Sequence, residues 1–111
     1  YMTQINPIDN LTQELRRGIL VLAVLSQLQE ERYGYEVIKL LADHGLEIDQ
    51  GTLYPLLRRL ETQGLLESRW ELEESRPRRY YSISPEGQEL LPQLHDEWSK
   101  IVNTIESLIQ K

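Results

Sequence analysis

The spacing of apolar residues changes at Gly64, and this change constrains the fold more than any other feature of the sequence. Before Gly64, apolar residues recur every three to four positions, as on one face of a helix. After Gly64, a polar turn over residues 73–77 separates two segments that read as strands. In these segments apolar residues fall on one side at a period of two: Leu66, Trp70 and Leu72 in the first, Tyr81 and Ile83 in the second. Helices therefore precede a β-hairpin.

Local end signals divide the part before the hairpin into three helices. Asn10 starts a capping-box pattern, so the first helix is expected to begin there. Its apolar run over residues 19–25 predicts burial on most sides. Gly18 costs a helix about 1 kcal/mol relative to alanine and is expected to mark the close approach of another helix. The second helix is expected to open at residues 33–36 and to close at Gly45.

The third helix is the stretch from Asp49, a favourable N-cap, to Gly64, a favourable terminator. Leucines at helical spacing form its buried side: Leu53, Leu56, Leu57 and Leu60. The other sides carry Gly51, Pro55, Arg58 and Thr62 in front, with Thr52 and Arg59 on one flank and Tyr54 on the other. This front suits insertion into a DNA major groove. Taken alone, however, the stretch favours an ordinary amphipathic helix with solvated arginines.

A fourth helix follows the hairpin and runs to the carboxyl end. Ser84 and Pro85 are a serine cap and a proline at the first helical position. The apolar residues show the alternating three-and-four spacing of a helix that packs on a partner helix: Leu91, Leu94, Trp98, Ile101, Ile105 and Leu108. This stripe is longer than a small domain can cover, which predicts a dimer with Leu11 in the same interface. Pro92 is expected to kink the helix near its start.

The composition excludes several classes of protein. The chain has 111 residues, enough for one domain, and no cysteine, which excludes disulfides and fits a reducing cytoplasm. No apolar run approaches the roughly 18 to 20 residues of a membrane span, so we expect a cytoplasmic protein without a membrane partner. Neither a phosphate loop nor a catalytic constellation can be named, so we expect no enzyme and no cofactor. For His44 and His95, solvated helix faces are favoured over a metal site.

The net charge of -6 counts against nucleic-acid binding, which a basic patch favours. The charge is segregated, however, because residues 75–83 contain Arg76, Arg78 and Arg79 and no acid. The field at a contact surface matters more than the sum of charges. These three arginines are therefore expected to bind DNA phosphates, which supplies salt-dependent affinity for DNA without sequence specificity. The alternative is that they are merely solvated.

The order of three helices, a two-stranded hairpin and a long helix describes a winged helix. We therefore predict a mainly α (α+β) fold: a winged helix-turn-helix with a two-stranded β wing and a long C-terminal dimerisation helix. Residues 1–8 are expected to form an N-terminal arm, in part a remnant of cloning because Tyr1 precedes Met2. Residues 9–84 form the winged helix-turn-helix DNA-binding domain, and residues 85–111 the C-terminal dimerisation helix.

Four motifs in order resemble the PadR family of bacterial transcription regulators, over roughly residues 11–110. They are Tyr33-Gly34-Tyr35-Glu36; Gly51-Thr52-Leu53-Tyr54-Pro55 with Leu57, Arg59, Leu60 and Glu61; Gly64-Leu65-Leu66; and Arg79-Tyr80-Tyr81 with Ile83 and Gly87. The single carboxyl-terminal helix resembles the small subgroup of that family. The resemblance implies a homodimeric repressor that binds a pseudo-palindromic operator in double-stranded DNA and releases it when a small molecule binds.

The residue pattern and the resemblance together give candidate sites. For DNA we expect contacts from Gly51, Thr52, Tyr54, Pro55, Arg58, Arg76, Arg78 and Arg79, with Arg58 the candidate for guanine readout. Multidrug-responsive members of the family carry a tryptophan at the place of Trp98 and stack a planar aromatic ligand between two subunits. The resemblance therefore implies an effector site, which we expect to be lined by Trp98, Leu15, Ile19 and Val102. The alternatives are core packing for Trp98 and for Tyr54, and an ion pair for Arg59.

A function of a different class also remains open. The acidic balance favours a winged-helix module that acts mainly in protein–protein interaction, without a small-molecule effector. Preference for the protein's own promoter DNA over random duplex separates the two hypotheses.

Overall fold

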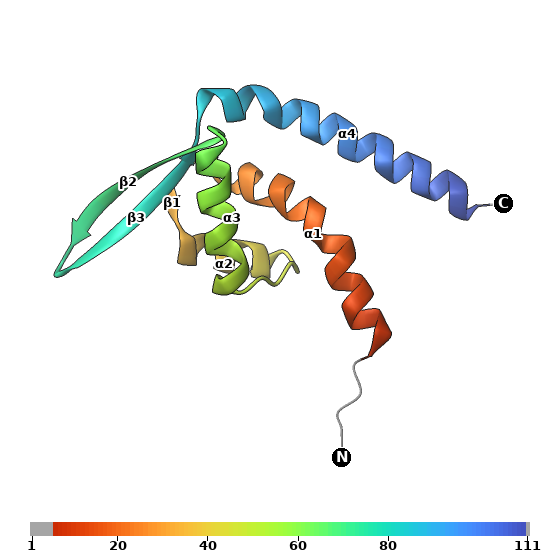
Figure 1. Ribbon diagram of the computed structural model, residues 1–111, viewed down its shortest axis with the longest axis horizontal. Coiled ribbons are helices and arrows are strands. Elements are labelled where there is room, and N and C mark those ends of the chain that lie inside the picture. Colours follow the sequence, from red (N-terminus) through yellow and green to blue (C-terminus); the bar gives the residue numbers. More distant parts are fainter. Residues whose placement is uncertain (1–5, 111) are drawn as a thin grey trace, which may run out of the picture.

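The computed structural model describes residues 6–110, which form four helices and three strands (Figure 1). In chain order these are α1 (Pro7–Gln27), β1 (Arg32–Tyr33), α2 (Gly34–Asp43), α3 (Gln50–Thr62), β2 (Leu66–Glu73), β3 (Arg76–Ile83) and α4 (Pro85–Ile109). The predicted winged-helix α+β fold with a long last helix is confirmed. No helix within the described range is long and apolar enough to cross a membrane.

The sheet has a strand that the sequence did not predict. β1 lies antiparallel to β3, with Arg32 opposite Tyr81 and Tyr33 opposite Tyr80, so the strand order is β1-β3-β2. Two residues are too few to show an alternating pattern, because a typical strand has about five or six. β1 nevertheless attaches the start of α2 to the base of the hairpin.

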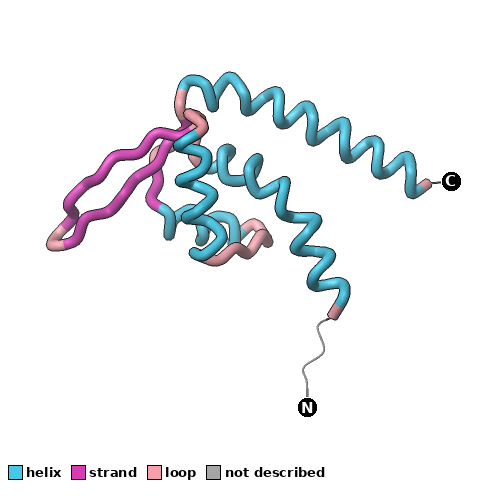
Figure 2. The backbone as a smooth tube through the Cα atoms, viewed as in Figure 1, coloured by secondary structure: helices cyan, strands magenta, loops and turns pink. Residues whose placement is uncertain are grey.

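The hairpin of β2 and β3 extends away from the helices as a wing (Figures 1 and 2). Its strands pair from Leu66 opposite Ile83 to Glu73 opposite Arg76. The turn is therefore only two residues long, shorter than the expected turn over residues 73–77, and Glu74 adopts a positive φ of 58° in it. Pro77 fits in β3 because β1 pairs only nearer the base, which leaves this part of β3 an edge that tolerates proline.

The core lies where α1, α2 and α3 meet the base of the sheet. Its buried members are Val24, Leu25, Leu28, Val37, Leu41, Leu53, Leu57, Leu60, Leu66, Tyr81 and Ile83. The predicted leucine stripe of α3 is confirmed, with Leu56 half-buried beside the three buried leucines. The burial expected for residues 19–25 is found only at Val24 and Leu25, because the other five residues are half-buried.

The start of α1 differs from the expectation. The helix begins at Pro7, and the Asn6 side chain caps it by accepting a hydrogen bond of 3.0 Å from the Ile8 N–H. An asparagine cap followed by proline is a stronger start signal than the pattern at Asn10, which lies inside the helix. Pro7 and Ile8 therefore belong to α1 rather than to an arm, and residues 1–5 of the expected arm lie outside the described part.

Two helical glycines have opposite surroundings. A Cβ at Gly18 would meet no atom within 4 Å, so the expected close approach of a helix is wrong within this chain. The reason is that the first half of α1 extends beyond the helical body (Figure 1). A Cβ at Gly87, in contrast, would lie 2.3 Å from the Leu65 carbonyl oxygen. Only glycine allows α4 to leave the sheet so close to that backbone.

The end signals of the other elements are confirmed. Gly45 and Gly64 adopt positive φ values of 92° and 82° after α2 and α3. The Ser84 side chain caps α4 by accepting a hydrogen bond of 3.0 Å from the Gly87 N–H. α4 is one continuous helix through Pro92, and beyond its first turns it projects away from the rest of the molecule (Figure 1).

The two glycines give a matched test of this packing. Gly87→Ala is expected to lower the free energy of unfolding by about 1–3 kcal/mol, because the new methyl group overlaps backbone. Gly18→Ala is expected to raise it by about 0.5–1 kcal/mol, because alanine has the better helix propensity and the space is open. Urea unfolding followed by circular dichroism measures both. Equal effects of the two substitutions would contradict this packing.

Candidate nucleic-acid interface

The solvent-exposed front of α3 carries small side chains in its first turn and basic side chains further along. The Asp49 carboxylate accepts a hydrogen bond of 2.8 Å from the Thr52 N–H and so fixes the first turn. The leucine side is held in the core, which leaves the opposite side exposed: Gly51, Thr52, Pro55, Arg58 and Arg59. In Figure 1, α3 lies between the wing and α1. The helix is thus rigidly held along its buried side and open along its front.

Tyr54 has a packing role besides its predicted contact with DNA. Its half-buried ring lies so close to Gly34 that a Cβ there would be 2.5 Å from Tyr54 Cε1. The ring therefore joins α3 to the start of α2, and this contact explains the glycine of the Tyr33–Glu36 motif. This placement agrees in part with the alternative that Tyr54 belongs to the core.

A groove separates α3 from the wing and brings several predicted residues together. It is a cavity of about 460 Å³ lined by Tyr33, Gly34, Tyr35, Gln50, Tyr54, Trp70, Arg76, Pro77, Arg78 and Arg79. The sequence reasoning gave Tyr54 and the three arginines to DNA but missed Tyr33, Tyr35, Gln50 and Trp70. Trp70 is 62% exposed and lies opposite Arg79 in the hairpin register. The alternation of the strand placed it on the same apolar side as the buried Leu66, so no local signal marked it as exposed.

Two of the three wing arginines are engaged within the chain. Arg79 Nη2 lies 2.9 Å from Glu61 Oε1, and Arg79 Nε donates a hydrogen bond of 3.1 Å to Ser68 Oγ. Arg78 lies with its guanidinium carbon 4.4 Å from the centre of the Tyr33 ring, and its Nε is 3.6 Å from Glu73 Oε1. Arg79 thus holds the wing to α3, so the alternative of merely solvated wing arginines is wrong for these two.

The far face of the wing carries a second set of polar contacts. Arg69 binds Glu31 through two hydrogen bonds of 2.6 and 2.7 Å and also contacts Glu71. The Arg69 hydrogen bonds lower the pKa of Glu31. The Tyr80 hydroxyl donates to Glu73, which raises the pKa of Tyr80 to about 12. Because Glu31 precedes β1, the Arg69 pair ties the wing to the helical body on the side away from α3.

The predicted effector and dimerisation residues lie along α1 and α4. Leu15 and Trp98 are 77% and 38% exposed, whereas Ile19 and Val102 are half-buried. The cavity of about 510 Å³ between the two helices is instead lined by Leu22, Ser26, Gln29, Gln88, Leu91, Pro92 and His95. Of the dimerisation residues, Leu91 and Leu94 pack against the core, and the others are exposed: Leu11, Trp98, Ile101, Ile105 and Leu108.

Comparison with known proteins places this architecture in a family. Residues 21–93 match the model of the "Transcriptional regulator PadR-like family". The transcriptional regulator Rv3488 of Mycobacterium tuberculosis (strain ATCC 25618 / H37Rv) is 36% identical over 80 residues, which cover 71% of this chain and 75% of that protein.

Solved structures agree with this assignment. A PadR family transcriptional regulator from Eggerthella lenta DSM 2243 is 46% identical, with a TM-score of 0.89 over 94% of this chain and 93% of its own. A PadR-like transcriptional regulator from Bacillus cereus strain ATCC 14579 is 31% identical, with a TM-score of 0.76 over 88% and 98% of the two chains. The chain therefore belongs to the PadR-like family of transcriptional regulators, as its motifs indicated.

Proposed function

We propose that this transcriptional regulator is a repressor that binds a pseudo-palindromic operator as a homodimer and releases it when a planar aromatic molecule binds. The exposed front of α3 carries the proposal, because its leucine side is anchored in the core and its small first turn leaves room for DNA. α3 lies in the major groove and the wing follows the phosphate backbone. As a member of its family, the chain is a regulator and not an enzyme.

Arg58 is the proposed base-reading residue. It is exposed on the front of α3, and no carboxylate among the described residues lies within 4.0 Å of its guanidinium group. A guanidinium group can donate two hydrogen bonds to the major-groove edge of one guanine. An unpaired arginine on the helix front is therefore available for sequence readout.

Arg58→Ala is expected to reduce the preference for the protein's own promoter DNA over random duplex by about 1–3 kcal/mol. Fluorescence anisotropy with both duplexes at one salt concentration measures this preference, and Lys100→Ala on α4 is the control of equal charge change. Equal weakening on both duplexes would mean that Arg58 contacts phosphate only. A wild-type protein without any preference for its promoter would favour the protein-interaction module instead.

The exposed apolar side of α4 is the proposed dimer interface. Trp98, Ile101, Ile105 and Leu108 continue the stripe that begins with the half-buried Leu91 and Leu94, and α1 adds Leu11. Isolated exposed apolar residues are common, but a continuous stripe of this length on a projecting helix marks an interaction surface. We assign that surface to a second copy of the chain, because the heptad spacing is self-complementary.

Ile105→Glu is expected to convert the dimer into a monomer, because the change places a charge in the middle of the apolar stripe. Sedimentation velocity at micromolar protein concentrations measures the change. Asn103→Glu adds the same charge to the α4 face away from the stripe and is expected to leave the dimer intact. Monomeric wild-type protein at these concentrations would refute the proposed interface.

The proposed effector site lies between the two Trp98 rings of the dimer, with Leu15, Ile19 and Val102 beside them. The ring of Trp98 is 38% exposed in the single chain, so it has a surface to offer. Flat aromatic molecules stack on such a surface with favourable dispersion and quadrupole interactions.

Each of the two tryptophans can be observed alone in a single-tryptophan variant. In Trp70→Phe, a planar aromatic dye is expected to quench the fluorescence of Trp98 and to weaken promoter binding. In Trp98→Phe, the same dye is expected to leave the fluorescence of Trp70 unchanged. Quenching confined to Trp70 would move the ligand to the groove beside the wing.

A further inference from the structure

The arginines of the chain divide into two groups by their partners. Ion pairs within the chain engage Arg32, Arg69, Arg78 and Arg79. The other five arginines have no carboxylate within 4.0 Å among residues 6–110: Arg16, Arg17, Arg58, Arg59 and Arg76. Four of these five lie on α1 and α3, so the uncompensated positive charge is concentrated on the helices rather than on the wing.

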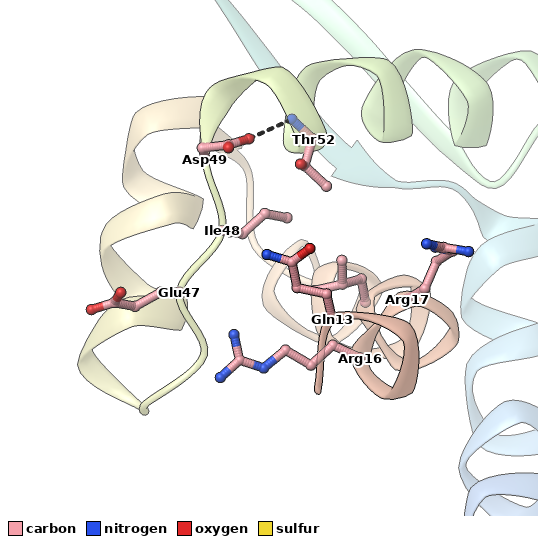
Figure 3. A pocket seen from close by; sticks show the side chains of 8 residues that line it. Gln13, Arg16, Arg17, Glu47, Ile48, Asp49 and Thr52 are labelled. Atoms are coloured by element: carbon pink, nitrogen blue, oxygen red, sulfur yellow. Dashed lines mark hydrogen bonds between the residues drawn. The ribbon is translucent and has the colours of Figure 1, made fainter. Parts of the chain in front are cut away.

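A continuous groove runs along α3 on the side away from the wing. One of its two cavities, of about 310 Å³, is lined by Gln13, Arg16, Arg17, Leu20, Glu47, Ile48, Asp49 and Thr52 (Figure 3). The other, of about 250 Å³, is lined by Arg17, Leu20, Thr52, Pro55, Leu56 and Arg59. They share Arg17, Leu20 and Thr52, and we call them together the α1–α3 groove. Its basic side chains come from both walls: Arg16 and Arg17 from α1, and Arg59 from α3.

The two acids that line the α1–α3 groove form no salt bridge with its arginines. The Asp49 carboxylate is held by its hydrogen bond of 2.8 Å to the Thr52 N–H. The Glu47 side chain points away from the guanidinium groups of Arg16 and Arg17 (Figure 3). The arginines are also accessible, since Arg17 and Arg59 are exposed and Arg16 is half-buried. An anion entering the groove therefore meets cationic side chains without a carboxylate salt bridge to break.

We infer that the α1–α3 groove binds the DNA phosphate backbone on the side of the major groove opposite the wing, with Arg17 and Arg59 as the phosphate ligands. This inference rests on the proposed function, which places α3 in the major groove. The major groove is about 12 Å wide and has a phosphate backbone on each side, so a helix in it lies between two rows of phosphates. The wing meets one row, and the α1–α3 groove meets the other.

Neutralising one phosphate ligand has a defined effect on salt dependence. In Arg17→Gln and in Arg59→Gln, the slope of log K against log salt is expected to fall in magnitude by about 0.9 for each phosphate that the variant no longer neutralises. Binding to promoter DNA and to random duplex is expected to weaken equally, because phosphates carry no sequence information. Lys100→Gln removes one charge from α4 and is expected to behave as the wild type. Thermal unfolding checks that the variants fold, since both arginines are exposed.

Ethylation of single phosphates locates the contacts directly. In the wild type, ethylation is expected to interfere on both sides of the major groove. Arg17→Gln is expected to remove interference at one phosphate on the side of the α1–α3 groove, and Arg76→Gln at one phosphate on the side of the wing.

Two results would overturn the inference, and they differ from each other. If the wild type prefers its promoter but Arg17→Gln and Arg59→Gln keep its slope and affinity, the groove is not a phosphate site and the proposed function stands. If the wild type shows no preference for its promoter at any salt concentration, the proposed function fails and the inference fails with it.

Discussion

A buried hydrogen-bonded junction at Ser84 sets the directions of α3, the wing and α4. The Ser84 hydroxyl donates a hydrogen bond of 2.6 Å to the Gly64 carbonyl and accepts one of 3.0 Å from the Gly87 N–H. The Ser84 N–H donates to the Leu65 carbonyl at 3.0 Å, and the Ile83 N–H to the Leu28 carbonyl at 2.7 Å. The end of α1, the end of α3, the exit of β3 and the start of α4 therefore meet at one point.

This junction links the proposed DNA-binding elements to the proposed dimer helix. Its polar groups are satisfied by one another, and Ser84 is only 2% exposed, so a small shift at one element would leave buried groups unpaired. Gly87 adds a steric limit, since Leu65 backbone occupies the space of a side chain there. In the proposed dimer, the separation of the two α3 helices thus follows from how α4 leaves the junction.

Local signals were predictable from the sequence, and contacts distant in sequence were not. The caps at Asp49 and Ser84 and the glycines that end α2 and α3 depend on a few neighbouring residues, so residue type identified them. The predicted start of α1 was wrong because two asparagines, Asn6 and Asn10, compete as caps within one short stretch. The close approach expected at Gly18 was wrong because a glycine in a helical pattern does not reveal what lies opposite it. The pairs Arg69–Glu31 and Arg79–Glu61 join residues 38 and 18 positions apart, which no local pattern encodes.

The placement of the charges matters more than their sum for how an acidic chain would bind DNA in the proposed complex. The net charge of -6 counts every charged group equally, yet several acids are paired with arginines of the wing: Glu31, Glu61, Glu71 and Glu73. Screening in water makes distant surface acids, such as those on α4, weak competitors at α3. In the proposed complex, a phosphate responds to the local field, to which the unpaired arginines on α1 and α3 contribute positive charge. The basic run in the hairpin was the obvious signal in the sequence, but much of its charge serves to hold the wing in place.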